Sequence, residues 1–347
     1  MKPTYLIICI VLLISGCKNE YTPRDISDFV ITEYPIDSVS IRAIHAENKD
    51  KVFFAGSNGK IGFTNNAGKT WNKQIIKFKD SITPSFRSIA FNRNEIFVLS
   101  VANPALLYRI SDLKTDLVYE EHHKKVFYDC MKFFDDGLTG IAVGDPTENC
   151  PSIIMTYDGG NSWKKLPSTT LPNFQNGEAF FAASNTNIKI INNTVWIASG
   201  GKKARILKSK DKGKTWEIFK TPIVQGNGPQ GIYSIDFIDE DNGIIVGGDY
   251  SKPDDNCENK AITNDGGETW KIISNNEAPN YKSCVKYVPN SEGKEIIAVG
   301  KTGISFSSNA GKTWKNISKK GYYAIQWVDK NNAWLSGNNK IAKLVIR

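Results

Sequence analysis

The chain has 347 residues, a formal net charge of +8 and six cysteines. This length suits two ordinary domains or one large repeat fold, because repeat folds grow by adding units. The basic residues are interspersed with acidic ones and form no stripe, which argues against nucleic acid as a partner. The sequence has no Gly-rich nucleotide loop, no Cys-x-x-Cys pair and no haem motif, so we expect no cofactor and no metal.

The first residues have the pattern of a signal peptide. A single early cation, Lys2, precedes the apolar run Tyr5–Ile14, which at about ten residues is too short for the roughly 20 that span a bilayer. The next segment, Ile14-Ser15-Gly16-Cys17, resembles the bacterial lipobox. That resemblance implies cleavage before Cys17 and acylation of its thiol. We therefore expect an exported bacterial lipoprotein, held at a membrane by its acyl chains, in the periplasm or at the cell surface.

An eight-residue pattern recurs five times in the rest of the chain. It consists of a hydroxyl or polar residue, any residue, Asp or Asn, any residue, Gly, any residue, Thr or Ser, and Trp. The copies are Thr64–Trp71, Thr156–Trp163, Ser209–Trp216, Thr263–Trp270 and Ser307–Trp314. Gly supplies the positive φ of a tight turn and the Asp or Asn oxygen accepts backbone N–H bonds, so each copy predicts a hairpin turn between two strands. The third position is therefore predicted to be structural: Asn66, Asp158, Asp211, Asp265 and Asn309.

A second pattern gives the number of units. Seven short runs that align with one another begin at Arg42, Arg87, Asp129, Glu178, Tyr233, Ser283 and Tyr323. Each is followed by an apolar strand that usually ends in Gly or Ser. Repeats of several short strands joined by turns indicate an all-β fold, and seven units predict a seven-bladed β-propeller with four-stranded antiparallel blades.

The two ends of the chain complete this prediction. The last unit has three strands, and the N-terminal run Asp28–Thr32 can supply the fourth, which would close the ring and remove its open edge. A six-bladed ring with an extra terminal strand pair is the alternative. The chain then divides into a signal peptide (1–16), a linker after the lipidated cysteine (17–27) and a single propeller domain (28–347).

The candidate ligand residues follow from the same alignment. In a propeller the first strand of each blade lines the central channel, so the starts of the seven runs meet at one mouth. The side chains there differ from blade to blade, which suits a binding site better than a scaffold. The predicted ligand-binding residues are Arg42, Arg87, Asp129, Glu178, Tyr233 and Tyr323.

Four cysteines remain in the exported domain. Cys130 and Cys284 take the same position in two of the runs, while Cys150 and Cys257 lie in two long loops that belong to the same face. Disulfides are the usual state of cysteines in an exported chain. We therefore predict the pairs Cys130–Cys150 and Cys257–Cys284, each of which would hold a loop over the channel mouth.

The five copies of the turn pattern resemble the Asp-box, or bacterial neuraminidase repeat, of propellers typified by the photosystem II assembly and stability factor family. This resemblance covers the mature length and implies a noncatalytic binding or assembly module with a protein or glycan at the mouth. Sialidases resemble the chain more distantly and imply the alternative, a glycoside hydrolase that uses Glu178, Asp129 and Tyr233. The Arg-Ile-Pro motif of sialidases is absent, and no third arginine accompanies Arg42 and Arg87. We therefore favour the binding module.

Overall fold

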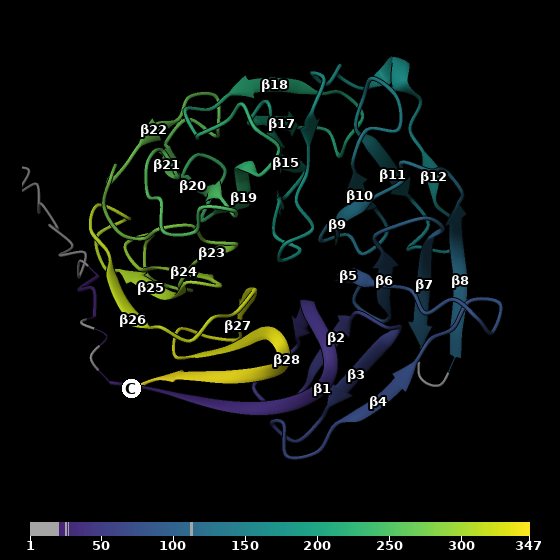
Figure 1. Ribbon diagram of the computed structural model, residues 1–347, viewed down its shortest axis with the longest axis horizontal. Coiled ribbons are helices and arrows are strands. Elements are labelled where there is room, and N and C mark those ends of the chain that lie inside the picture. Colours follow the sequence, from purple (N-terminus) through teal and green to yellow (C-terminus); the bar gives the residue numbers. More distant parts are fainter. Residues whose placement is uncertain (1–20, 25, 27, 112–113) are drawn as a thin grey trace, which may run out of the picture.

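The computed structural model describes residues 21–347, except residues 25, 27, 112 and 113, and shows a ring of antiparallel sheets around a central axis (Figure 1). The expected signal peptide (1–16) and the lipidated Cys17 lie outside the described residues. The described part contains one short 3-10 helix, η1 (Ser168–Thr170). No helix in it is long and apolar enough to cross a membrane.

The strands of the described residues form six sheets. In order of pairing, the first sheet is β27 (Ala324–Trp327), β28 (Asn332–Ile346), β1 (Phe29–Ala46), β2 (Val52–Gly56), β3 (Lys60–Thr64) and β4 (Asn72–Ile75). The second is β5 (Phe86–Phe91), β6 (Ile96–Ser100), β7 (Ala105–Ser111) and β8 (Lys114–Glu121). The third is β12 (Lys164–Lys165), β11 (Ser152–Thr156), β10 (Gly140–Gly144) and β9 (Tyr128–Phe133).

The other three sheets complete the ring. One is β14 (Ile188–Ile191), β15 (Thr194–Ala198), β17 (Arg205–Ser209) and β18 (Glu217–Lys220). The next is β13 (Glu178–Ala179), β16 (Gly200–Gly201), β19 (Gln230–Phe237), β20 (Gly243–Asp249), β21 (Lys260–Thr263) and β22 (Lys271–Ile272). The last is β23 (Cys284–Tyr287), β24 (Ile296–Gly300), β25 (Gly303–Ser307) and β26 (Lys315–Ser318).

The prediction of seven four-stranded blades is wrong. Counting one blade for each hydrogen-bonded sheet, the described residues form six blades, of which two contain six strands. The main cause is the length of β1, which pairs with β28 over Phe29–Pro35 and with β2 over Ile41–Ala46. The last and first sequence units therefore share one sheet. Six blades correspond to the alternative that the sequence left open.

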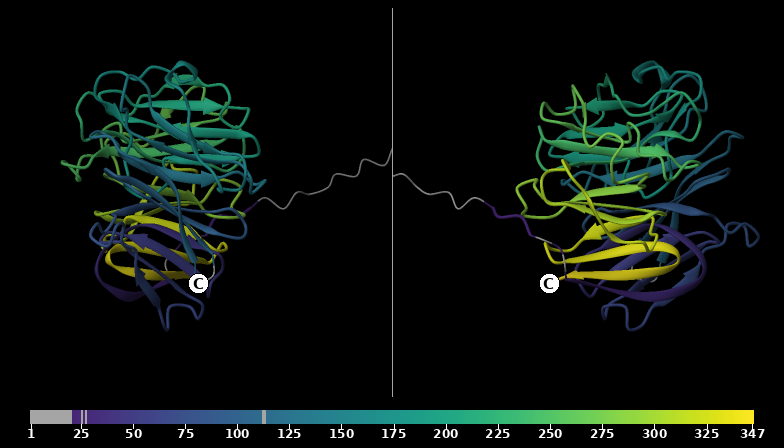
Figure 2. Two further views of the ribbon diagram at one scale, coloured as in Figure 1. Left: turned by 90° about the vertical axis from the view of Figure 1, so that its right-hand side faces the viewer. Right: turned by 60° about the vertical axis from the view of Figure 1, so that its left-hand side comes forward.

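The two ends of the chain lie side by side and close the ring. Residues Phe29–Pro35 of β1 pair in register with Lys340–Ile346 of β28, as the sequence led us to expect. Figure 2 shows this contact from the side, with β1 in purple along β28 in yellow. This pairing ties the first strand of the chain to the last one, which favours one cooperative ring.

The repeated turn pattern forms hydrogen-bonded hairpins, as predicted. In the second copy the Asp158 carboxylate accepts an N–H bond from Ser162 at 2.9 Å, and the hydroxyl of Thr156 accepts one from Gly160, whose φ is +93°. Burial raises the pKa of Asp158, but the hydrogen bonds from Ser162 outweigh it and bring the pKa down to about 2. Such a carboxylate supports the turn and is not a general acid. Asn66 makes the equivalent bond to the N–H of Thr70 at 2.9 Å.

The hydrophobic core lies between neighbouring blades. The Trp163 ring, which ends one hairpin of the third sheet, packs against Phe97 of β6 and Phe133 of β9, with ring centroids 6.3 and 5.7 Å away. Phe97 and Trp163 belong to one buried cluster that draws on two adjacent sheets, and the partly buried Phe133 packs against it. The tryptophan at the end of the pattern thus joins one blade to the next, which large aromatic rings do well because of the area that they bury.

The innermost strands surround the axis and set the position of any axial site. They are β1 (from Ile41), β5, β9, β14, β19, β23 and β27, and each contacts the next around the ring (Figure 1). The closing sheet contributes two of them, β1 and β27. We call the end at which these strands begin the upper mouth and the end at which they finish the lower mouth.

Candidate functional site

A pocket of about 480 Å³ opens at the upper mouth. Four of the six predicted ligand-binding residues line it: Arg42, Arg87, Tyr233 and Tyr323. Loop residues that the sequence did not single out complete the wall, among them Phe181, Tyr250, Tyr281 and Lys301. Of these residues, Tyr250 could have been predicted from the sequence, because it follows the apolar strand that ends at Gly248 and lies in a loop assigned to the same face.

A recurring irregularity of the inner strands places the first-position side chains at this mouth. Arg42, Arg87, Asp129 and Tyr233 are each skipped in the pairing of their strand with the next one, so each occupies a β-bulge. A bulge adds one unpaired residue, bends the strand and redirects a side chain. The repeated bulge therefore turns the start of an inner strand toward the axis, instead of leaving it in the alternation of the sheet.

The two arginines are fixed by a segment that crosses the mouth. Arg42 Nη1 donates to the carbonyl oxygen of Ala183 and Arg87 Nη1 to that of Ala182, each at 3.1 Å. The Arg42 guanidinium also lies 4.0 Å from the centre of the Tyr323 ring, a cation–π distance. Its Nε is buried and has no hydrogen-bond partner among the described residues. The pair thus presents two neighbouring positive charges with donors that the protein itself does not use.

Burial and mutual repulsion act on this pair. Burial first, and the charge of Arg42 second, lower the pKa of Arg87. A guanidinium remains protonated at neutral pH even so, because its ordinary pKa lies above 12. An anionic group placed between the two side chains would relieve the repulsion.

The opposite wall of the pocket is aromatic. The Phe181 and Tyr233 rings stack at 3.9 Å with an angle of 5° between their planes, and Tyr281 meets Tyr233 edge-on at 4.9 Å. The Tyr233 hydroxyl donates to the carbonyl oxygen of Pro229 at 2.7 Å, and burial raises its pKa. This hydroxyl is therefore held as a neutral donor, which does not suit a nucleophile.

Two carboxyl groups, Asp129 and Asp145, accompany the arginines. Asp129 is fully buried, does not line the pocket, and neither of its carboxyl oxygens has a hydrogen-bond partner among the described residues. Burial, and then the charge of Asp145, raise its pKa well above the ordinary value, while Arg87 lowers it. Asp145 lines the pocket and accepts an N–H bond from Phe180 at 2.8 Å, and burial raises its pKa to about 6.

Glu178 does not line the pocket. It is buried in an ion pair with Arg205, with 2.6 Å between Nη2 and Oε2, and it also accepts the Ser199 hydroxyl at 2.7 Å. The run that begins at Glu178 forms β13, whereas the inner strand of this part of the ring is β14, further along the chain. The sequence alignment thus selected the wrong segment at this point, because β14 is short and lacks the shared pattern.

Neither predicted disulfide is formed, and Cys130, Cys150, Cys257 and Cys284 are free thiols. Cys130 and Cys284 are buried, and burial raises the pKa of Cys130 to about 11. The Cys284 thiol lies 3.9 Å from the carbonyl oxygen of Ile325 on the neighbouring strand β27. The Cys284 side chain therefore points toward the neighbouring inner strand and not toward the loop that carries Cys257, so its position does not favour the predicted disulfide. Cys257 remains exposed in its loop.

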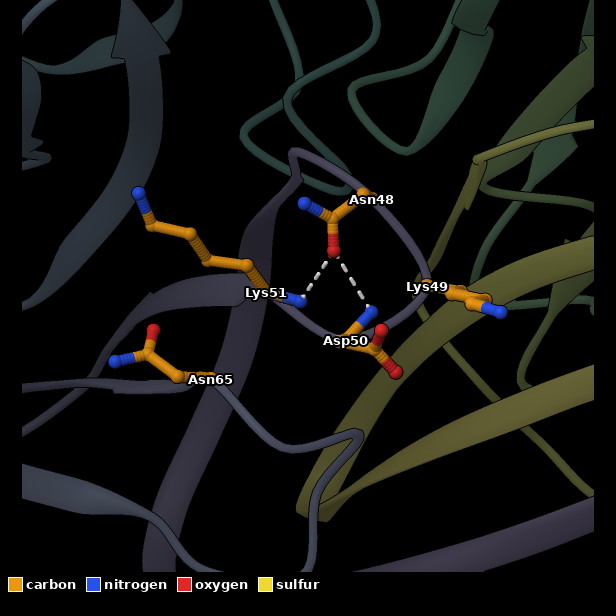
Figure 3. A pocket seen from close by; sticks show the side chains of 5 residues that line it. All are labelled: Asn48, Lys49, Asp50, Lys51 and Asn65. Atoms are coloured by element: carbon orange, nitrogen blue, oxygen red, sulfur yellow. Dashed lines mark hydrogen bonds between the residues drawn. The ribbon is translucent and has the colours of Figure 1, made fainter.

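A second hollow lies at the β1–β2 turn, close to the lower mouth (Figure 3). Its shape comes from the turn itself, because the Asn48 side-chain oxygen accepts the backbone N–H groups of Asp50 and Lys51, each at 2.9 Å. The residues that line it are exposed or half-buried. The hollow therefore presents no preorganised buried group to a ligand, and it is the weaker candidate.

No known family profile and no curated protein sequence matches the chain. Solved structures do resemble it, and they are β-propellers. One, described as YCF48 bound to D1 peptide, has a TM-score of 0.67 and 14% identity over 94% of this chain and 100% of that one. The structure of the RRP9 WD40 repeats has a TM-score of 0.65 and 10% identity, and the match covers 94% of this chain and 100% of that one. Virginiamycin B lyase from Staphylococcus aureus has a TM-score of 0.62 and 14% identity, and the match covers 92% of this chain and 100% of that one.

At these identities the likeness establishes the fold alone. A β-propeller carries binding functions in some proteins and catalysis in others, as the lyase in this group illustrates. The function must therefore be argued from the residues of the pocket.

Proposed function

We propose that this protein is a noncatalytic binding propeller of the assembly-factor kind, whose upper-mouth pocket binds a short segment of another protein. The observation that carries the proposal is the pair Arg42 and Arg87, with unused donors, opposite an aromatic wall. Arginine pairs suit carboxylates because the guanidinium offers several N–H donors in one plane. The expected ligand therefore combines an acidic group with an apolar or aromatic side chain.

The size of the pocket agrees with a short segment. A volume of about 480 Å³ is in the range of sites that take a small molecule or a few side chains. The neighbour described as YCF48 bound to D1 peptide shows that another propeller of this shape is found with a peptide, which supports a protein partner for this chain. Lys301 at the rim, where its Nζ donates to the Tyr250 carbonyl oxygen at 2.6 Å, adds a further positive charge for an acidic segment.

The glycoside hydrolase alternative finds little support in the pocket. Glycosidases need two carboxyl groups, or a tyrosine with a carboxyl partner, free to act on the bound sugar. Glu178 is engaged by Arg205, Asp129 is buried out of contact with the pocket, and the Tyr233 hydroxyl donates to a backbone carbonyl. None of the three predicted catalytic residues is therefore free for that chemistry.

The proposal includes the lipid anchor at Cys17, and the described start of the chain indicates how it would orient the ring. Arg24 forms an ion pair with the buried Glu295, with Nη2 to Oε2 at 2.6 Å, and the Tyr21 hydroxyl donates to the same carboxylate. Glu295 precedes β24, in the turn after β23, at the lower mouth. Four residues of extended chain reach at most about 14 Å, so an acylated Cys17 would hold the lower mouth near the membrane. The upper pocket would then face away from it.

A peptide-selection experiment tests the binding function. A random twelve-residue phage-displayed library, selected on the full chain with Cys17→Ser, should yield peptides with an acidic residue next to an apolar one. The double variant Arg42→Gln with Arg87→Gln should weaken their binding at least tenfold. A control with the same charge change, Lys69→Gln with Lys312→Gln in exposed hairpin turns, should bind as the parent does. Equal binding by both double variants, or turnover of chromogenic glycosides by the parent, would refute the proposal.

A further inference from the structure

The lower ends of the inner strands carry a group of lysines. Lys132 of β9, Lys189 of β14 and Lys286 of β23 lie there together with a single carboxylate, Asp236 of β19. We call these four residues the lower-mouth lysine cluster. They lie toward the opposite end of the inner strands from the upper pocket, and none of them lines that pocket.

Asp236 neutralises only part of this charge. Its Oδ1 lies 2.8 Å from Lys189 Nζ and 3.4 Å from Lys286 Nζ, and its Oδ2 accepts the backbone N–H of Tyr287 at 2.9 Å. Burial raises the pKa of Asp236, but the two lysines outweigh it and lower the pKa, so the carboxylate is ionised at neutral pH. Three lysines against one carboxylate leave a net charge of +2 (3 − 1) when all three are protonated.

Lys132 has no counter-ion in the part of the chain that the structure describes. Lys132 lies on β9, which contacts β14, the strand that carries Lys189. Burial lowers the pKa of Lys132, and the charges of Lys286 and Lys189 lower it further. A partly buried charge without a partner is costly, because it loses hydration and gains nothing in return. The cluster is therefore an arrangement that an anion would stabilise.

His45 adds a donor next to Lys132. Burial, followed by the charge of Lys132, lowers the pKa of His45 to about 4, so the ring is neutral at pH 7. Its Nε2 is buried and has no hydrogen-bond partner among the described residues. A neutral imidazole can donate one N–H bond from this nitrogen without adding a charge to the cluster.

The cluster is accessible from solvent. The Lys189 and Lys286 side chains are 25% and 21% exposed, whereas Asp236 is 5% exposed. A small anion can therefore reach the ammonium groups without a rearrangement of the strands.

We propose that the lower-mouth lysine cluster is a binding site for a doubly charged oxyanion of the phosphate class. A tetrahedral dianion balances the +2 charge and offers oxygen atoms to ammonium groups that approach from three strands. The group can arrive as a free ion or as the phosphomonoester of a lipid headgroup, since the proposed anchor would hold this face near a membrane. The site does not depend on the peptide-binding function proposed for the upper mouth.

Inorganic phosphate is the first probe. Thermal unfolding of the full chain with Cys17→Ser should show a melting temperature that rises and saturates with phosphate, relative to chloride at matched ionic strength. Lys132→Met should weaken the apparent affinity at least tenfold, because it removes the lysine without a partner and leaves the Lys189–Asp236 pair intact. Lys49→Met, in the exposed β1–β2 turn of Figure 3, is the matched control and should behave as the parent does.

Vesicles separate the two sources of phosphate. Cosedimentation with vesicles that contain phosphatidic acid, a phosphomonoester lipid, but not with phosphatidylcholine vesicles would identify a lipid headgroup as the ligand if it is lost in Lys132→Met. A response to phosphate alone would identify the free ion. Two results overturn the proposal. One is the absence of any response that depends on Lys132. The other is a phosphate effect that survives Lys132→Met and disappears in Arg42→Gln with Arg87→Gln, which would place the anion in the upper pocket.

Discussion

Substitutions in the ion pair between Glu178 and Arg205 test whether Glu178 has a structural role or a catalytic one. The Glu178 side chain has no exposed surface and that of Arg205 is 15% exposed. The contact is bidentate, since Arg205 Nε donates to Oε1 at 2.9 Å and Nη2 to Oε2 at 2.6 Å. Glu178 Oε2 also accepts the N–H of Gln175 at 3.0 Å. We therefore expect the pair to stabilise the segment that crosses the upper mouth.

The size of the effect follows from which partner is removed. Arg205→Met leaves an unexposed carboxylate without a counter-ion, and breaking a buried pair in this way costs about 3–5 kcal/mol. At about 2.1 cal/mol/K of unfolding entropy per residue over roughly 320 residues, this lowers the melting temperature by about 4–7 °C. Glu178→Gln should cost less, about 1–3 kcal/mol, because Arg205 is partly exposed and keeps its bond to the Asn173 carbonyl oxygen.

Urea and thermal unfolding followed by circular dichroism measure these differences. The double variant Glu178→Gln with Arg205→Met should be more stable than Arg205→Met alone, because it removes the unpaired charge. From the most to the least stable, the expected order is the parent, Glu178→Gln, the double variant and Arg205→Met. If Arg205→Met unfolds within 1 kcal/mol of the parent, or if the double variant is the least stable of the four, the reasoning is refuted.

Three further outcomes are expected. Burial raises the pKa of Asp145 to about 6 from 3.8, so its stabilising contribution is complete below about pH 4 and is lost as the pH rises through 6. The melting temperature of Asp145→Asn should therefore fall less than that of the parent between about pH 4 and pH 6. An unchanged dependence of the melting temperature on pH would contradict this. Asp211→Asn should preserve stability, because Asn66 supports an equivalent turn. Asp211→Ala should lower the free energy of unfolding in urea by about 1–2 kcal/mol, because it removes the acceptor of the turn's N–H bonds. Equal losses in the two variants would count against this role of the side chain. Arg24→Ala should speed chymotryptic cleavage after Tyr21 several-fold and lower the melting temperature, because it leaves the unexposed Glu295 carboxylate without its counter-ion, and resistance to the protease would show that the ion pair does not hold this segment.

The candidate site was only partly visible in the sequence. Arg42, Arg87, Tyr233 and Tyr323 were found because the inner strands share a pattern and begin at the same mouth. The bulge that directs three of them inward leaves no recognisable residue signal, since it is a property of pairing between strands. Glu178 was misplaced for the same reason, because pattern alone did not show that β14 and not β13 is the inner strand.

The lysine cluster was missed altogether. Lys132 and Lys286 take equivalent places in two aligned runs, but Lys189 lies outside that alignment. Their common position became evident only when the strands were placed around one axis. Asp236, which two of the lysines share, comes from yet another strand.

The sequence by itself determined the hairpins. Each turn uses a hydroxyl, an Asp or Asn and a Gly within eight residues, so its hydrogen bonds close locally and can be inferred from spacing, as at Asp158 and Asn66. The tertiary structure alone decided the number of sheets, the state of the cysteines and which charges meet at each mouth. Those features depend on pairing between segments far apart in the chain, such as Phe29–Pro35 with Lys340–Ile346, whose register and bulges no local pattern encodes.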